Sequence, residues 1–186
     1  MGNVTKNMFV YEYRFDGKIR DILIVDCGIG FPDPEMYGVD LVIPDVRYLQ
    51  DKKQYIRGLI FTHGHDDHIG GIPYVYGKLG NIPMWGTVLT AAFANIKLRE
   101  IKLKARVTPV GFDKTLKIGA FTVSFVRMTH SVPDAANLVV ETPVGIYYHG
   151  SDFKFDFDPL DGKLSELPKI NAVGTRGVLC LLSDSL

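Results

Sequence analysis

A run of six residues, 63–68, holds three of the five histidines in this 186-residue chain. His63 and His65 are two residues apart, so both imidazoles can face one ion, whereas Asp67 and the adjacent His68 would face a second ion. Imidazole and carboxylate are ligands that zinc and similar divalent cations prefer. The run therefore predicts a site for two metal ions. The alternative is a solvated, acidic first turn of a helix that happens to be rich in histidine.

Three further candidates stand where apolar segments end. His130 follows the predicted strand 121–129, and Asp152 follows the predicted strand 145–148. Strands hold the short loops at their ends rigidly, which suits a metal site at a sheet edge. Taken alone, His130 would be read as a surface or core histidine, and Asp152 lies among several other carboxylates. Asp26 ends another apolar strand, where it would either bond a ligand imidazole or cap a loop.

The elements that must position these residues are mainly strands at the start and end of the chain, with strands and helices mixed in the middle. Residues 8–14 and 19–26 flank an Asp16-Gly17 turn and predict a β-hairpin. A proline- and glycine-rich loop follows over 28–45. Helices are predicted at 69–79 and at 87–102, the second with Thr87 as N-cap and Val88, Ala91, Ala92, Ile96 and Leu98 as apolar positions. Further strands are predicted at 58–62, 106–110, 115–118, 120–128, 137–141, 145–148 and 177–182, with a short helix near Ser165. We expect a layered α/β domain.

Composition narrows the class of protein. Hydrophobic residues make up 46% and charged residues 23%, with a formal net charge of zero, which is typical of one folded domain. Zero net charge gives no support to nucleic-acid binding, so such a function must be argued from the site. Cys27 and Cys180 are expected to be buried free thiols, in keeping with a reducing compartment. Without a signal peptide or a membrane-length apolar run, we expect a cytoplasmic protein that does not enter membranes.

The pattern of ligand types resembles a known superfamily. The spacing His63-x-His65-x-Asp67-His68, with His130 and Asp152 downstream and Asp26 upstream, resembles the metallo-β-lactamase superfamily. Longer stretches are similar to one branch of it, the ribonuclease J (β-CASP ribonuclease) family. These stretches are Asp26–Gly28, Phe31–Pro32, Gly38–Asp45, Ile69–Tyr74, His130–Asp134, Glu141–Gly145, Asp152–Asp156 and Leu182–Ser185. They occur in order over nearly the whole chain.

The resemblance implies a layered αββα fold and a role for each candidate. One metal would be held by His63, His65 and His130, the other by Asp67 and His68, with Asp152 bridging the two and Asp26 supporting a ligand. The implied cofactor is a pair of divalent ions, with zinc as the default and manganese as the alternative. Asp67 and His68 are assigned as catalytic, because Asp67 would also orient the attacking water. Ser131 would contact a substrate phosphate, unless it only caps its loop.

The chain also departs from the family pattern. The resemblance implies that residues 1–186 form only the first half of a metallo-β-lactamase-like domain, without the inserted β-CASP domain, the C-terminal domains or the final metal-ligand histidine. Gly150-Ser151-Asp152 stands where Thr-Gly-Asp is usual. Half of the fold would leave one sheet face short of partners, so a homodimer that completes it is expected as one solution.

Three functions remain open at this stage. The leading hypothesis is a metal-dependent hydrolase that cleaves RNA phosphodiesters with a dimetal-activated water. The second is a small hydrolase acting on lactams, lactones or thioesters, which fits a compact chain of zero net charge. The third is a non-catalytic metal-binding fragment. For this last class, the basic residues Lys97, Arg99, Lys102, Lys104 and Arg106 would either contact a phosphate backbone or form a solvated helix face.

Overall fold

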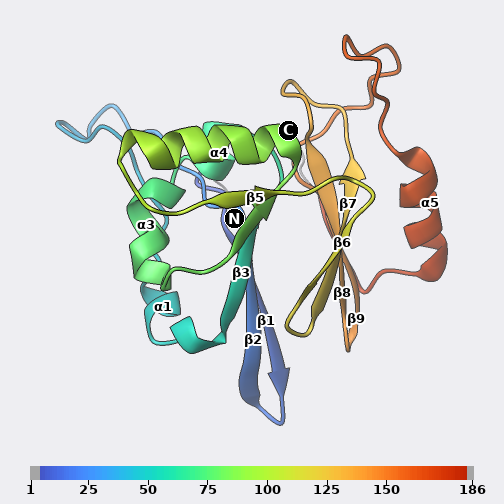
Figure 1. The fold of residues 1–186 in the computed structure, drawn as a ribbon, viewed down its shortest axis with the longest axis horizontal. Helices are drawn as coiled ribbons and strands as arrows, with labels where there is room; N and C mark the ends of the chain where they lie inside the picture. Colours follow the sequence, from blue (N-terminus) through green and yellow to red (C-terminus); the bar gives the residue numbers. More distant parts are fainter. Residues whose placement is uncertain (1–4, 184–186) are drawn as a thin grey trace.

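The computed structural model describes residues 5–183, which fold into four layers (Figure 1). Two five-stranded β-sheets pack face to face and helices cover both outer faces, giving an αββα arrangement. The helices over the first sheet are α1 (Arg47–Gln50), α3 (Ile72–Leu79) and α4 (Val88–Glu100), and the helix over the second is α5 (Leu167–Arg176). The layered α/β fold predicted from the sequence is confirmed. Asp184 and Ser185, which belong to the last family-like stretch, lie outside the described residues.

The first sheet is built by the N-terminal part of the chain. Its order is β1 (Phe9–Phe15), β2 (Lys18–Val25), β3 (Ile56–Phe61), β4 (Met84–Gly86) and β5 (Val107–Pro109). β1 and β2 form the predicted hairpin, and Asp16 and Gly17 turn the chain with φ of 49° and 67°. Positive φ at both central residues matches the twist of a two-stranded ribbon. β2 to β5 run parallel, so their carboxyl ends meet at one edge.

The second sheet is built by the C-terminal part. Its order is β10 (Cys180–Leu182), β9 (Gly145–His149), β8 (Ala136–Thr142), β7 (Phe121–Arg127) and β6 (Thr115–Ile118). Neighbours are antiparallel except β10, which runs parallel to β9. β7 and β9 therefore point the same way and end at the same edge.

Successive side chains of β2 point into different hydrophobic clusters, which join the first sheet to the layers on both of its sides. Ile22 and Ile24 pack under the helices, whereas Leu23 and Val25 pack against the second sheet. All four are fully buried, which explains why this segment is continuously apolar rather than alternating. The expectation of a sheet face without partners is not met, because α5 covers the outer face of the second sheet and buries Val173 there.

Several predicted elements have different bounds in the structure. The helix predicted at 69–79 is divided at Gly70-Gly71 into the single turn α2 (Asp66–Ile69) and α3. The helix near Ser165 is the ten-residue α5, and the strand predicted at 177–182 is reduced to β10. The short helix α1, the strand β4 and a 3₁₀ turn at Lys53–Tyr55 were not predicted; at three or four residues they are too short to show a periodic pattern.

Two predictions about burial were partly wrong. In α4, Val88 and Ile96 are 61% and 42% exposed, and Ala92 is exposed as well. Thr90 and Ala94 are buried instead because they face the sheet. Cys27 is buried as predicted, but Cys180 is only half-buried because β10 lies at the sheet edge. Both thiols are free. Among residues 5–183, no helix combines the length and the apolar character that crossing a membrane requires.

Candidate metal centre

The sequence candidates meet at one rim of the molecule, between the carboxyl ends of strands from both sheets. Asp26 follows β2 and His63 follows β3, while His130 and Asp152 lie just beyond β7 and β9. These residues are far apart in sequence. They come together because β2 and β3 run parallel and because β7 and β9, both antiparallel to β8, point the same way. Asp67 and His68 belong to α2, a single turn that starts directly after His65.

Four residues form what we call the first ligand group: His63, His65, His130 and Asp152. Nδ1 of His65 lies 3.1 Å from Nε2 of His63 and 3.2 Å from Nε2 of His130. Oδ2 of Asp152 lies 3.9 Å and 3.7 Å from the same Nε2 atoms. Ligand atoms about 2.0–2.1 Å from a tetrahedral zinc ion lie about 3.3 Å from one another. The spacing of these donor atoms therefore fits one divalent ion.

The second ligand group consists of Asp67, His68 and, again, Asp152. Nε2 of His68 lies 3.2 Å from Oδ1 of Asp152 and 3.6 Å from Oδ2 of Asp67. Asp152 thus turns one oxygen toward each group, as a carboxylate that bridges two ions must. Three protein donors leave a fourth tetrahedral position at this group.

Asp26 lies behind the second group and is completely buried. Its carboxylate accepts hydrogen bonds from the backbone N–H of Thr62 and from the Thr62 hydroxyl, both at 2.8 Å, and it lies 2.8 Å from Nδ1 of His68. Burial alone would raise the pKa of Asp26, but His68 outweighs it and holds that pKa below its ordinary value. An ionised Asp26 keeps the proton of His68 on Nδ1, which leaves Nε2 to face the ligand group.

Thr62 connects Asp26 to the first ligand group. Its hydroxyl lies 3.1 Å from Nδ1 of His63 and 2.9 Å from Oγ of Ser151. Since the hydroxyl donates its hydrogen to Asp26, its oxygen accepts a hydrogen bond from Nδ1–H of His63, so Nε2 of His63 carries the free lone pair. Burial, reinforced by the nearby His68, lowers the pKa of His63 far below its ordinary value. His63 is therefore a neutral imidazole, the form that binds metals.

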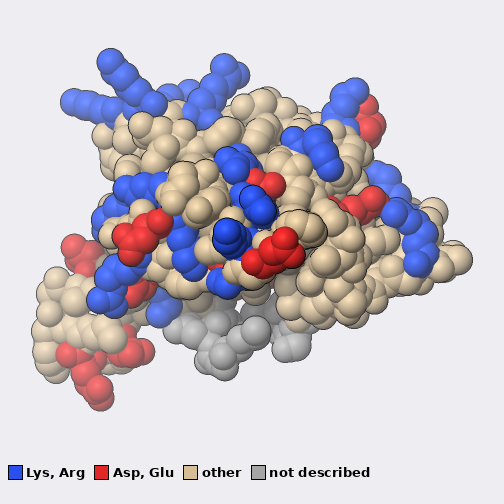
Figure 2. Space-filling view, turned by 90° about the horizontal axis from the view of Figure 1, so that it is seen from below, with Lys and Arg blue, Asp and Glu red and all other residues tan. Residues whose placement is uncertain are grey.

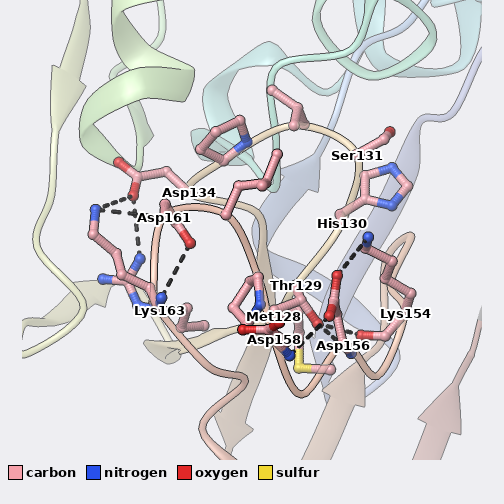
Figure 3. Close-up of a pocket in the computed structure, with 15 residues that line it drawn as sticks. Met128, Thr129, His130, Ser131, Asp134, Lys154, Asp156, Asp158, Asp161 and Lys163 are labelled. Atoms are coloured by element: carbon pink, nitrogen blue, oxygen red, sulfur yellow. Dashed lines mark hydrogen bonds and ion pairs between the residues drawn. The ribbon is translucent and has the colours of Figure 1, made fainter.

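A cavity of about 230 Å³ opens beside the first ligand group (Figure 3). His130 and Ser131 stand on one side of it, and Asp134, Asp161 and Lys163 on the other. Ser131 is exposed, and its hydroxyl lies 3.3 Å from Nε2 of His65. The cavity is therefore in reach of the ligand groups and is large enough for part of a substrate.

Several basic residues are paired with carboxylates. Of the segment 97–106, Lys97 pairs with Asp66 at 2.6 Å, which ties α4 to α2. Figure 2 shows the end of the molecule that carries the β1–β2 turn, where acidic side chains stand among many Lys and Arg. Two of the ion pairs in this part of the fold are Arg14 with Glu12 and Arg57 with Asp21.

The structure brings together all of the metal-ligand candidates predicted from the sequence, with Asp26 behind them and Ser131 at their edge. Sequence reasoning missed Thr62 and Asn7. Thr62 follows a buried strand directly before the histidines, which was an available signal, whereas Asn7 is remote in sequence and carried none. Ser151 was noticed only as a departure from the family pattern, although it supports Thr62.

Comparisons with known proteins agree with this geometry. Residues 6–172 match the family model of the metallo-beta-lactamase superfamily. The chain is 39% identical over 193 residues to ribonuclease J of Thermus thermophilus, and 41% identical over 186 residues to ribonuclease J of Synechocystis. These matches cover 100% and 98% of this chain but only 33% and 28% of the relatives. The chain thus spans about a third of the length of the curated relatives it matches.

Solved structures show the same fold at low sequence identity. A protein of unknown function from Enterococcus faecalis superposes with a TM-score of 0.62 at 15% identity, over 82% of this chain and 41% of that one. The metallo-beta-lactamase fold protein YhfI from Bacillus subtilis gives a TM-score of 0.50 at 16% identity, over 83% of this chain and 58% of that one. These likenesses concern the fold alone.

Proposed function

The chain belongs to the metallo-beta-lactamase superfamily, and we propose that it is the metal-binding part of an RNA-hydrolysing enzyme of the ribonuclease J type. The observation that carries the proposal is the pair of ligand groups joined by Asp152, whose two oxygens face different groups. The relatives named ribonuclease J, which match essentially the whole chain, support RNA as the substrate class. In this proposal, residues 1–186 form part of one metallo-β-lactamase-like domain.

Zinc is the proposed ion at both groups, with manganese as the alternative. Imidazole nitrogens make up three of the four donors of the first group, which favours zinc, while the two carboxylates of the second group suit either ion. Two such ions supply an activated water at neutral pH and stabilise charge that develops on phosphoryl oxygens.

The protein's own residues have distinct tasks in this reaction. Asp26 and Thr62 hold the imidazoles of His68 and His63 in the tautomers that present Nε2. Asp67, on the short helix α2, would accept a hydrogen bond from the attacking water and so orient it. Ser131, exposed beside His65, would donate a hydrogen bond to a substrate phosphate oxygen.

Two further expectations extend the proposal. A homodimer and a cytoplasmic location remain predictions from the sequence. Lactams, lactones and thioesters are the competing substrates, because the same ligand groups would serve their hydrolysis.

Cleavage of end-labelled single-stranded RNA tests the proposal. The chain is freed of metal with a chelator and assayed after addition of Zn²⁺ or Mn²⁺. The variant His65→Ala is assayed in the same way as a control. Nitrocefin and a lactone are tested as alternative substrates. We expect RNA products from the wild type with metal, and at least about a hundredfold less from His65→Ala, since a ligand of the first group is lost. Equal cleavage by both proteins, or turnover of nitrocefin or the lactone alone, would contradict the RNA assignment.

A further inference from the structure

Ser151 brings a hydroxyl group to the rear of the first ligand group. The residue is buried, and its Oγ lies 2.9 Å from Oγ1 of Thr62, with a longer contact of 3.4 Å to Nδ1 of His63. Gly150-Ser151-Asp152 stands where Thr-Gly-Asp is usual in the family. A glycine has no side chain that could make these contacts. The hydroxyl is therefore an addition that this chain makes to the usual pattern.

Neighbouring strands hold the backbone of Ser151 in this place. The N–H of Ser151 donates to Oδ1 of Asn137 at 3.0 Å, and Nδ2 of Asn137 donates to the hydroxyl of Tyr148 at 3.2 Å. The N–H of Gly150 donates to the carbonyl of Leu182 at 2.7 Å, and a Cβ atom at Gly150 would lie 2.8 Å from that oxygen. The chain thus has no side chain at 150, where β10 passes, and a small polar one at 151, where it faces the ligand group.

The Asp26 carboxylate sets the direction of the hydrogen bonds around this hydroxyl. A carboxylate only accepts, so the Thr62 hydroxyl donates its one hydrogen to Asp26. The Thr62 oxygen then has two lone pairs, and it accepts one bond from the Ser151 hydroxyl and one from Nδ1–H of His63. The hydroxyl groups of Ser151 and Thr62 form a short chain of donors that ends on the carboxylate. In such a chain each hydrogen bond strengthens the next.

This chain of donors decides which nitrogen of His63 carries the proton. The hydrogen of Ser151 is directed to Thr62 and the hydrogen of Thr62 to Asp26, so only oxygen lone pairs face Nδ1 of His63. A ring nitrogen that faces lone pairs carries the proton, and Nε2 is then left free on the side of the first ligand group. Loss of the Ser151 hydroxyl removes one of the two oxygens near Nδ1 and the donor that polarises the other.

We propose that Ser151 is a positioning residue for the first metal ion and acts through Thr62 on the imidazole of His63. The inference rests on the proposed function in that it requires an ion at the first ligand group. Its consequence is that one chain of hydrogen bonds, from Ser151 through Thr62 and Asp26 to His68, orients an imidazole in each ligand group.

The tautomer of His63 in the metal-free protein tests the assignment, measured by long-range proton–nitrogen NMR correlation at neutral pH. Ser151→Ala removes only the hydroxyl, Ser151→Gly introduces the usual family residue, and Ser124→Ala, in the middle of β7, is the control. We expect the Nδ1–H form in the wild type and the control. In both Ser151 variants the Nε2–H form gains population, so the two nitrogen resonances of His63 move toward one another. A residue that served only packing would change the melting temperature and leave these resonances in place.

Zn²⁺ affinity of the same proteins, measured by competition with a chromophoric chelator, gives the second readout. The first site is identified by comparison with His65→Ala, which lacks one of its ligands. We expect both Ser151 variants to bind the first ion about tenfold more weakly, because a group that orients a ligand imidazole is lost. An unchanged tautomer or an unchanged first-ion affinity in Ser151→Ala would overturn the inference, and RNA cleavage by the wild type would then still support the proposed function. If the variants change as expected but the wild type with metal cleaves no RNA, the proposed function fails and the inference stands.

Discussion

Asp26 controls the second ligand group without belonging to it. The carboxylate is buried, its backbone has a φ of 61°, and its oxygens bond Thr62 and Nδ1 of His68. A positive φ is uncommon for residues other than glycine and is retained where the surroundings over-determine it. At Asp26 this backbone conformation turns the chain out of β2, so that the carboxylate points back at Nδ1 of His68.

The variant Asp26→Asn tests that role. An amide –NH2 facing Nδ1 of His68 would favour the tautomer with the proton on Nε2, and this removes the lone pair that the second ion needs. We expect the affinity of the second site for Zn²⁺ to fall about 10- to 100-fold, measured by chelator competition. Asp66→Asn, on the same helical turn but exposed and paired with Lys97, is the control and should leave affinity unchanged. A second-site affinity within twofold of wild type in Asp26→Asn would refute the role.

At the scale of elements, close packing of the loop after β2 against α2 sets the position of the second group. A Cβ atom at Gly28 would lie 1.5 Å from the carbonyl oxygen of Asp67. The loop is also bonded to α2, since the N–H of Cys27 donates to the carbonyl of His68 at 2.7 Å. Only glycine allows the two segments to lie this close.

A pair of glycine substitutions measures this constraint. We expect Gly28→Ala to destabilise the fold by about 3 kcal/mol or more, because backbone must move to relieve the clash. Gly77→Ala, on the exposed side of α3 with nothing within 4 Å of the new methyl group, should stabilise by about 0.5–1 kcal/mol. Urea denaturation gives both values. A Gly28→Ala protein as stable as the wild type would show that the contact is not tight in solution.

At the scale of the whole molecule, the two sheets meet through a buried polar contact as well as through apolar packing. Tyr11 of β1 and His149 of β9 lie 2.8 Å apart, hydroxyl to Nδ1, although 138 residues separate them. Burial lowers the pKa of His149 to about 4. The histidine is therefore neutral at pH 7, and its Nδ1 accepts a hydrogen bond from the tyrosine hydroxyl.

This contact predicts a pH dependence of stability. An unfolded chain has a histidine pKa near 6.5, so between about pH 6.5 and pH 4 it binds more protons than the folded chain, and stability falls as the pH falls. Between pH 7 and pH 5 the loss from His149 is about 2 kcal/mol. His149→Asn keeps an acceptor for Tyr11 and removes the titration. We expect its free energy of unfolding, measured with chelator present, to decline less over this range; an equal decline in both proteins would contradict the assignment.

The sequence determined the types of the ligands and the class of fold. The run 63–68 and the positions of His130 and Asp152 after apolar segments indicated both ligand groups, because a ligand's chemistry and a strand's end are local properties. The short elements α1 and β4 escaped prediction, since three or four residues carry no periodicity. The division of the helix at Gly70-Gly71 was not predicted either, because it depends on close packing against the loop that contains Gly28.

Only the tertiary structure decided how far apart the donor atoms lie and which side chains support them. Asp152 turns one oxygen to each group, Thr62 connects Asp26 to His63, and Asn7 reaches the second group from 60 residues away in sequence. Such relations depend on the meeting of strand ends from two sheets. No single segment of the sequence encodes them, since each exists only after long-range packing has fixed the backbone to within a fraction of a bond length.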